Sequence, residues 1–295
     1  MKKILKMIGI TIFGVIALMT LSVVLFLYLS PQFGGAATKA QKNQYAASEH
    51  YQQGKFVNRI EAPLMSVPSL DLLKDFIKDA PNRSPKKSIS VQKLDSTEIV
   101  NHNSKLTKLT WFGHSAFLLQ MDGKNILIDP MLGESPSPLP LFGAKRYSKD
   151  LPIAIAKLPF IDAVLISHDH YDHLDYESIQ KLKHKVGEYF TPLGVGNHLV
   201  KWGIPKTKIH ELNWWDTTSF QEIELVCTPA RHFSGRGLTD RSATLWSSWV
   251  IKGRDKSVFF SGDSGYDTHF KEIGDKYGPF DITLMECGQY NERWK

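Results

Sequence analysis

The chain has 295 residues, of which 42% are hydrophobic and 22% are charged, and its formal net charge is +6. These values are ordinary for one large globular domain with a substantial core. The charge shows no basic stripe with interleaved aromatic residues, so nucleic acid is excluded as an expected partner. The two cysteines, Cys227 and Cys287, are too few for a disulfide scaffold or a four-cysteine zinc site. Both lie in apolar runs and are predicted to be buried.

The N-terminus contains a long apolar segment. Residues 7–29 include no charged side chain, and as a helix they would span about 34 Å, enough to cross a bilayer. Lys2, Lys3 and Lys6 precede the segment, which favours a cytoplasmic N-terminus and a domain outside the cytoplasm. We therefore expect a single-pass membrane protein with its transmembrane anchor at residues 1–30. The alternative is a cleaved signal peptide.

Residues 31–104 are predicted to form a linker and an N-terminal extension. Within this region, residues 70–78 have the spacing of a short amphipathic helix, and residues 81–87 have the composition of a loop. The pattern of the sequence changes at residue 105, where short apolar runs separated by polar residues begin. From there the chain is predicted to form one large domain, residues 105–295.

Short apolar runs alternate with polar turns through this domain. Asp122 and Gly123 predict a tight hairpin turn between two strands. Asp175 is predicted to cap a helix whose apolar face includes Ile179 and Leu182. Strands alternating with helices indicate a layered α/β fold. The predicted strands are residues 106–112, 116–121, 125–128, 163–167, 224–228, 257–261 and 281–287.

The strand at residues 163–167 leads directly into a cluster of histidines and a carboxylate. His168, His170, Asp172 and His173 are residue types that bind zinc and similar transition metals. His168 and His170 are two residues apart, so in an extended segment their side chains point the same way. Asp172 and His173 then face a neighbouring position. Four ligands this close, with a turn between the pairs, predict a site for two metals.

Two further candidate ligands follow other predicted strands. His232 follows the strand at residues 224–228, and Asp263 follows the strand at residues 257–261. Ligands at the same edge of one sheet would converge. His232 is therefore predicted to complete a three-histidine site with His168 and His170. Asp263 is predicted to bridge the two metals, and the glycines beside it allow a close backbone approach.

Some residues near the motif keep two interpretations. His114 either lines the site or serves a structural turn. Asp129, at the end of a strand, is a candidate for orienting a ligand histidine. Arg231 and Arg236 flank His232 and can either bind a phosphate or form salt bridges.

The pattern from His168 to His173 resembles the metallo-β-lactamase superfamily. More closely, the chain is similar to the phospholipases D that hydrolyse N-acylphosphatidylethanolamine and to their bacterial relatives. The resemblance covers roughly residues 45–295. The stretches that carry it are residues 111–115, 167–175, 191–196, 210–216, 229–237, 245–249, 260–266, 278–281 and 288–294.

This resemblance implies an αββα sandwich with two zinc ions at one edge of its two sheets. It implies that one further histidine, a few residues after 288–294, binds the second metal, and that a C-terminal helical segment follows. The sequence ends at Lys295, so the expected fold is C-terminally incomplete and the second site one ligand short. The implied ligands are His168, His170 and His232 on the first zinc, Asp172 and His173 on the second, and Asp263 between them.

The expected function is that of a zinc-dependent phosphodiesterase. A hydroxide held between two metals would attack the phosphorus of a phospholipid headgroup bond, and Asp172 would be the catalytic residue that orients it. A first alternative is a lactonase or another ester hydrolase of the same superfamily. A second is a membrane-attached metal-binding protein with weak catalysis. Metal content and turnover distinguish the three.

Overall fold

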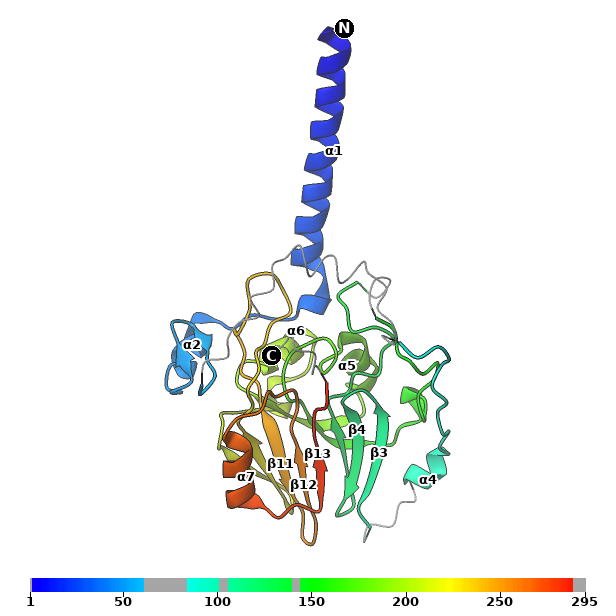
Figure 1. Ribbon diagram of the computed structural model, residues 1–295, viewed down its shortest axis with the longest axis vertical. Helices are drawn as coiled ribbons and strands as arrows, with labels where there is room; N and C mark the ends of the chain where they lie inside the picture. Colours follow the sequence, from blue (N-terminus) through cyan, green and yellow to red (C-terminus); the bar gives the residue numbers. More distant parts are fainter. Residues whose placement is uncertain (1, 61–83, 101–105, 140–143, 289–295) are drawn as a thin grey trace.

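The structure is a computed structural model, and it describes residues 2–60, 84–100, 106–139 and 144–288 (Figure 1). The predicted helix at residues 70–78 and the stretch after Gly288 lie outside these residues. The helices are α1 (Lys2–Leu29), α2 (Lys39–Tyr45), α4 (Ser96–Val100), α5 (Tyr176–Leu182), α6 (Gly196–Lys201) and α7 (His269–Tyr277). The strands are β1 (Tyr51–Gln52), β2 (Lys55–Phe56), β3 (Lys108–Gly113), β4 (Ala116–Met121), β5 (Lys124–Ile128), β6 (Ile161–Leu165), β7 (Val186–Pro192), β8 (Ile209–Leu212), β9 (Thr217–Phe220), β10 (Ile223–Thr228), β11 (Ser248–Lys252), β12 (Ser257–Phe260) and β13 (Ile282–Leu284).

The main domain contains two β-sheets. The six-stranded sheet has the order β3-β4-β5-β6-β7-β8, and the five-stranded sheet has the order β13-β12-β11-β10-β9. In the first sheet, β3, β4 and β5 pair antiparallel, whereas β5, β6, β7 and β8 run parallel. The second sheet is antiparallel except for the β12–β13 pair. The carboxyl ends of β5 and β6 therefore lie at the same edge of the first sheet.

Apolar side chains define four layers. The largest core lies between the sheets and includes Leu119 of one sheet and Trp249 of the other. A second core packs Ile179 and Leu199, from α5 and α6, on the outer face of the six-stranded sheet. A third packs Ile273 of α7 on the outer face of the five-stranded sheet. Helices thus cover both outer faces, and the predicted αββα sandwich is confirmed for the described residues.

Several predicted elements appear as expected. The strand at residues 116–121 is β4, and Asp122 and Gly123 form its turn to β5 with positive φ angles of 52° and 74°. Asp175 caps α5, because its side chain accepts a hydrogen bond from the Ser178 backbone amide. Strands β7, β8, β9 and β11 and helices α6 and α7 were not predicted. The strand expected at residues 281–287 is shorter, and Cys287 is exposed rather than buried, whereas Cys227 is buried.

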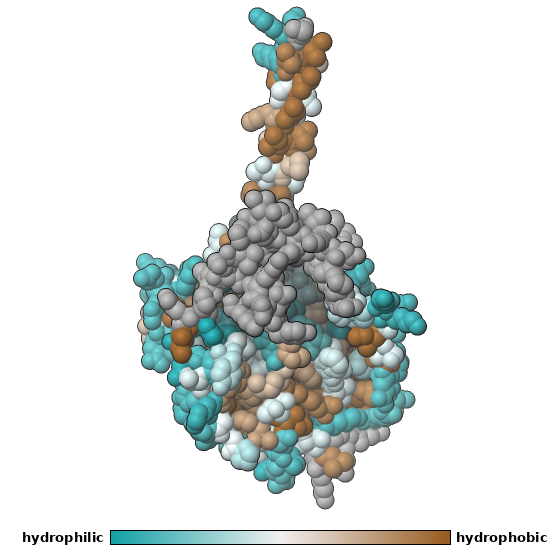
Figure 2. All heavy atoms as spheres, in the orientation of Figure 1, coloured by the Kyte–Doolittle hydropathy of each residue, from teal (hydrophilic) through white to brown (hydrophobic). Residues whose placement is uncertain are grey.

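The N-terminal helix projects away from the sandwich. Helix α1 has no buried side chain, and its most apolar window has a mean hydropathy of 2.7. Figure 1 shows α1 rising from one end of the domain, and Figure 2 shows that its surface is largely hydrophobic. By length and composition this helix can cross a membrane, and a signal sequence has the same properties. Its role as an anchor stays a prediction, as do the domain boundaries at residues 30 and 104.

Candidate metal centre

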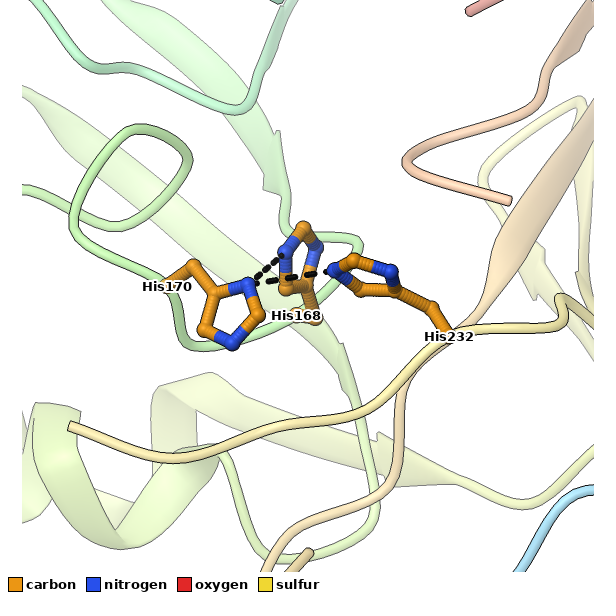
Figure 3. A group of neighbouring side chains, drawn as sticks. All are labelled: His168, His170 and His232. Atoms are coloured by element: carbon orange, nitrogen blue, oxygen red, sulfur yellow. Dashed lines mark hydrogen bonds between the residues drawn. The ribbon is translucent and has the colours of Figure 1, made fainter. Parts of the chain in front are cut away.

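The segment between β6 and α5, residues 168–174, is called the ligand loop below. Two of its histidines and one from the other sheet turn their ring nitrogens toward one another (Figure 3). The Nε2 atom of His168 lies 2.9 Å from Nδ1 of His170, and that Nδ1 lies 3.1 Å from Nε2 of His232. These three atoms form a compact group that offers three nitrogen ligands.

A second group of candidate ligands lies beside the first. His173, which is buried, places its Nε2 atom 3.1 Å from Oδ1 of Asp263 and 3.9 Å from Oδ2 of Asp172. His114 contributes a further nitrogen, since its Nε2 atom lies 3.0 Å from Oδ2 of Asp172. The other carboxylate oxygen of Asp263 lies 3.7 Å from His232. Asp263 therefore stands between the two groups.

These side chains come from both sheets. The ligand loop follows β6 of the six-stranded sheet, whereas His232 and Asp263 follow β10 and β12 of the five-stranded sheet. The expectation that they share one sheet edge was wrong, because the site forms where the edges of two packed sheets meet. Gly262 permits this approach, since a Cβ atom there would lie 2.8 Å from the Cβ of Ser167, and its φ is +55°.

Asp129 holds the base of the ligand loop. Its Oδ2 atom lies 2.7 Å from Nδ1 of His173, and its Oδ1 atom accepts a hydrogen bond of 2.7 Å from the Ser167 backbone amide. All three residues are buried. With Nδ1 engaged by the carboxylate, the His173 ring turns its Nε2 atom toward Asp263. Asp129 thus occupies the place of a carboxylate that orients a ligand histidine.

The electrostatics of the site favour the metal-binding forms of His168, His232 and Asp172. His173 differs, because burial opposes its protonation but the carboxylates of Asp263 and Asp129 outweigh this and raise its pKa. Burial, with the neighbouring imidazoles, lowers the pKa of His168 and lowers the pKa of His232 to about 3. Both rings are therefore neutral at pH 7 and offer lone pairs. Burial opposes ionisation of Asp172, but the hydrogen bond to His114 and the nearby His173 hold its pKa below the usual range, so it is a carboxylate.

The spacing of the donor atoms allows the three histidines to share one ion. Nitrogens bound at about 2.0–2.1 Å to a tetrahedral ion lie roughly 3.3 Å apart. The 2.9 Å and 3.1 Å contacts among His168, His170 and His232 are slightly shorter than this and also suit hydrogen bonds. Among the described residues, the buried Nε2 atom of His173 makes no well-aligned hydrogen bond, although Oδ1 of Asp263 lies 3.1 Å away. A buried nitrogen of this kind is stabilised when a ligand satisfies it. A cation at each group would satisfy these lone pairs.

The structure also distinguishes between the two interpretations that were open for His114, Arg231 and Arg236. His114 lies at the site, and the sequence signal for it was only its position after a strand in the stretch 111–115. Arg236 is buried, and its guanidinium donates to the backbone carbonyls of Gln32, Asp169 and Leu174, so it is not available to a phosphate. Arg231 donates to the carbonyl of Tyr266.

An αββα sandwich with a histidine and carboxylate cluster at the meeting edges of its sheets is typical of metal-dependent hydrolases. Residues 124–295 match the family described as the beta-lactamase superfamily domain. The chain therefore belongs to the metallo-β-lactamase superfamily.

Individual proteins are similar to this chain in sequence or in structure. An uncharacterized protein of Mycobacterium tuberculosis is 38% identical over 272 residues, which cover 91% of this chain and 72% of the relative. The N-acyl-phosphatidylethanolamine-hydrolyzing phospholipase D 1 of Caenorhabditis elegans is 35% identical over 195 residues, 63% of this chain and 54% of that protein. Among solved structures, CmlA, a diiron β-hydroxylase from Streptomyces venezuelae, is 26% identical with a TM-score of 0.45, covering 60% of this chain and 34% of that one.

Proposed function

We propose that this chain is a two-metal, zinc-dependent phosphodiesterase that cleaves a headgroup bond of a phospholipid. The observation that carries the proposal is a cavity of about 950 Å³ whose lining includes His114 and Asp172 of the metal centre. The same cavity is lined by apolar side chains such as Ile89, Val91 and Trp111. A substrate with a polar reactive group and a long apolar portion matches this combination.

The residues of the centre have separate roles in this proposal. One ion would be held by His168, His170 and His232. The other would be held by Asp172, His173 and His114, and Asp263 would lie between the two. Metal ions supply a nucleophile at neutral pH by lowering the pKa of water, and they stabilise the negative charge on phosphoryl oxygens.

Asp172 combines two properties that suit a catalytic carboxylate. It faces the cavity, and its pKa is low, so it is ionised at neutral pH. It can therefore accept a hydrogen bond from the attacking nucleophile and orient it. The hydrogen bond with His114 holds the carboxylate in place. His114 is also the third candidate ligand of the second group, beside Asp172 and His173.

Two further features favour a lipid substrate. The nematode relative is named for hydrolysis of N-acyl-phosphatidylethanolamine, and this chain covers 54% of it. Helix α1 would hold the domain at a bilayer surface, and the lysines before it favour a cytoplasmic N-terminus with the hydrolase domain outside the cytoplasm. A membrane-anchored enzyme would meet phospholipids at high local concentration.

The decisive experiment compares two substrates with the full-length protein in detergent micelles and zinc. We expect the unsubstituted protein to release phosphatidate from N-acylphosphatidylethanolamine. The His170→Ala variant should release none. Hydrolysis of a lactone without cleavage of the phosphodiester would instead identify an ester hydrolase. Absence of both reactions, with one metal per chain, would identify a metal-binding protein, and absence of any bound metal would contradict the proposed site.

A further inference from the structure

The residues that follow α1 are docked on the catalytic domain. We call residues Pro31–Gly35 the helix base. The indole Nε1 of Trp202 donates a hydrogen bond of 2.7 Å to the carbonyl of Pro31, and Nε of Arg236 donates one of 2.8 Å to the carbonyl of Gln32. The backbone amide of Gly35 donates to Nδ1 of His198 at 3.1 Å. Figure 1 shows the lower end of α1 above α6, the helix that carries His198.

Arg236 joins the helix base to the ligand loop. Besides the carbonyl of Gln32, its guanidinium donates to the carbonyl of Asp169 at 2.5 Å and to that of Leu174 at 2.8 Å. Its Cζ atom lies 4.1 Å from the centre of the Tyr171 ring. Asp169 and Leu174 lie near the two ends of the ligand loop. A single buried guanidinium therefore fixes both ends of the loop and the helix base.

His198 provides a second connection. Because Nδ1 accepts a hydrogen bond from the Gly35 amide, the ring proton of the neutral imidazole must be on Nε2. That nitrogen lies 3.2 Å from Oδ2 of Asp169 and donates to it. Asp169 stands between the candidate ligands His168 and His170. The amide of Gly35 thus selects the tautomer of His198 that holds this part of the loop.

We infer that the helix base is a positioning element of the metal centre, and that Arg236 and His198 transmit its docking to the ligand loop. Four of the candidate ligands lie in this loop, which has no strand or helix of its own between β6 and α5. Hydrogen bonds that orient metal ligands from outside are worth about 10–100-fold in metal affinity. The inference rests on the proposed metal site and not on the bond that the enzyme cleaves.

Glycines allow a test in the full-length protein. At Gly34, φ is +69° and a Cβ atom would lie 2.1 Å from Nδ1 of His198, so Gly34→Ala must displace the helix base or the His198 ring and break their contact. Gly54→Ala is the matched control. Gly54 has a φ of +81°, which gives the same kind of backbone strain, but a Cβ atom there has no neighbour within 4 Å.

The measurements use Co²⁺ as a probe, with the protein in detergent micelles. We expect Gly34→Ala to weaken Co²⁺ affinity about 10–100-fold, measured by competition with a chelator, and to change the visible absorption spectrum of bound Co²⁺. Gly54→Ala should change neither, even if it lowers the melting temperature. A loss of stability alone leaves the coordination spectrum of the folded protein unchanged, so the spectrum distinguishes positioning from general destabilisation.

A second variant keeps the inference testable if Gly34→Ala does not fold. In Arg236→Lys, one ammonium group cannot reach the carbonyls of Gln32, Asp169 and Leu174 together, so the same loss of affinity and change of spectrum are expected. Arg254→Lys, in an exposed ion pair with Glu222, is its control. Unchanged Co²⁺ affinity and spectrum in a folded Arg236→Lys protein would overturn the inference. Absence of turnover in the unsubstituted protein would overturn only the proposed function.

Discussion

The carboxylate of Asp129 lies 2.7 Å from Nδ1 of His173, and both side chains are fully buried. Asp129 directly follows β5 and His173 belongs to the loop after β6, so the parallel pairing of these strands brings the two residues together. The contact leaves Nε2 of His173 facing Asp263. One carboxylate thus sets the direction in which the most buried candidate ligand of the second group points.

Replacing that carboxylate tests its role. In Asp129→Asn, an amide faces Nδ1 of His173, so the ring loses its charged partner and its fixed orientation. We expect the affinity of the second metal to fall about 10–100-fold, measured by titration with a metal indicator. Asp162→Asn is a suitable control, because Asp162 lies on the neighbouring strand β6, accepts a hydrogen bond from the Asn125 amide, and is outside the metal centre. Equal metal affinity in both variants would count against the role of Asp129.

The three-histidine group is tested at its middle member. Nδ1 of His170 is within 3.1 Å of both other nitrogens, so His170→Ala removes the atom that the group shares. We expect loss of turnover and a lower metal content, measured by elemental analysis. His210→Ala replaces a partly exposed histidine paired with Glu188 and should change neither quantity. Unchanged metal and turnover in His170→Ala would refute the assignment of the site.

His114 is the ligand candidate that the structure adds. If it completes the second group, His114→Ala should reduce the bound metal from two ions to one per chain while His168, His170 and His232 still hold the other. Turnover should fall because the second ion is lost. The comparison is His184→Ala, which changes an exposed histidine. Two ions per chain in His114→Ala would show that His114 lines the centre without binding metal.

Removal of metal should destabilise the folded domain. The candidate ligands come from both sheets, so an ion bound there connects them and binds the folded state only. At metal concentrations about 100 times the dissociation constant, this linkage contributes roughly 2.7 kcal/mol. For a domain of this size we expect the melting temperature to fall by about 5–10 °C on chelation and to recover with zinc, measured by calorimetry. A melting temperature insensitive to chelator would contradict the site.

The apolar wall of the cavity predicts that substrates with long apolar chains bind more tightly than short ones. Ile89 lines it and is half exposed, so Ile89→Asp places a charge in the apolar wall with little risk to folding. We expect KM to rise for a long-chain phospholipid and to stay unchanged for a short, water-soluble phosphodiester. Val200→Asp, on the exposed face of α6, controls for an added surface charge. An equal effect on both substrates would argue against lipid binding in this cavity.

Local patterns identified part of the fold. Strand β4, its turn at Asp122 and Gly123, and the cap of α5 at Asp175 follow from alternation, turn chemistry and capping, which act over a few residues. Strand β11 was not predicted, since four of its five residues are buried and no alternation is visible. Strand β7, which lies in the middle of the parallel part of its sheet, was also not predicted. Buried residues follow one another along it without alternation.

The ligand loop could be recognised from its sequence, because H-x-H-x-D-H after an apolar strand places its ligands by local spacing alone. The positions of His232 and Asp263 after strands also predicted them as partners. The tertiary structure was needed to show that two sheets supply the site, that His114 reaches Asp172, and that Arg236 joins the helix base to the loop. These contacts join residues far apart in the chain, and they depend on how the layers pack rather than on any short pattern.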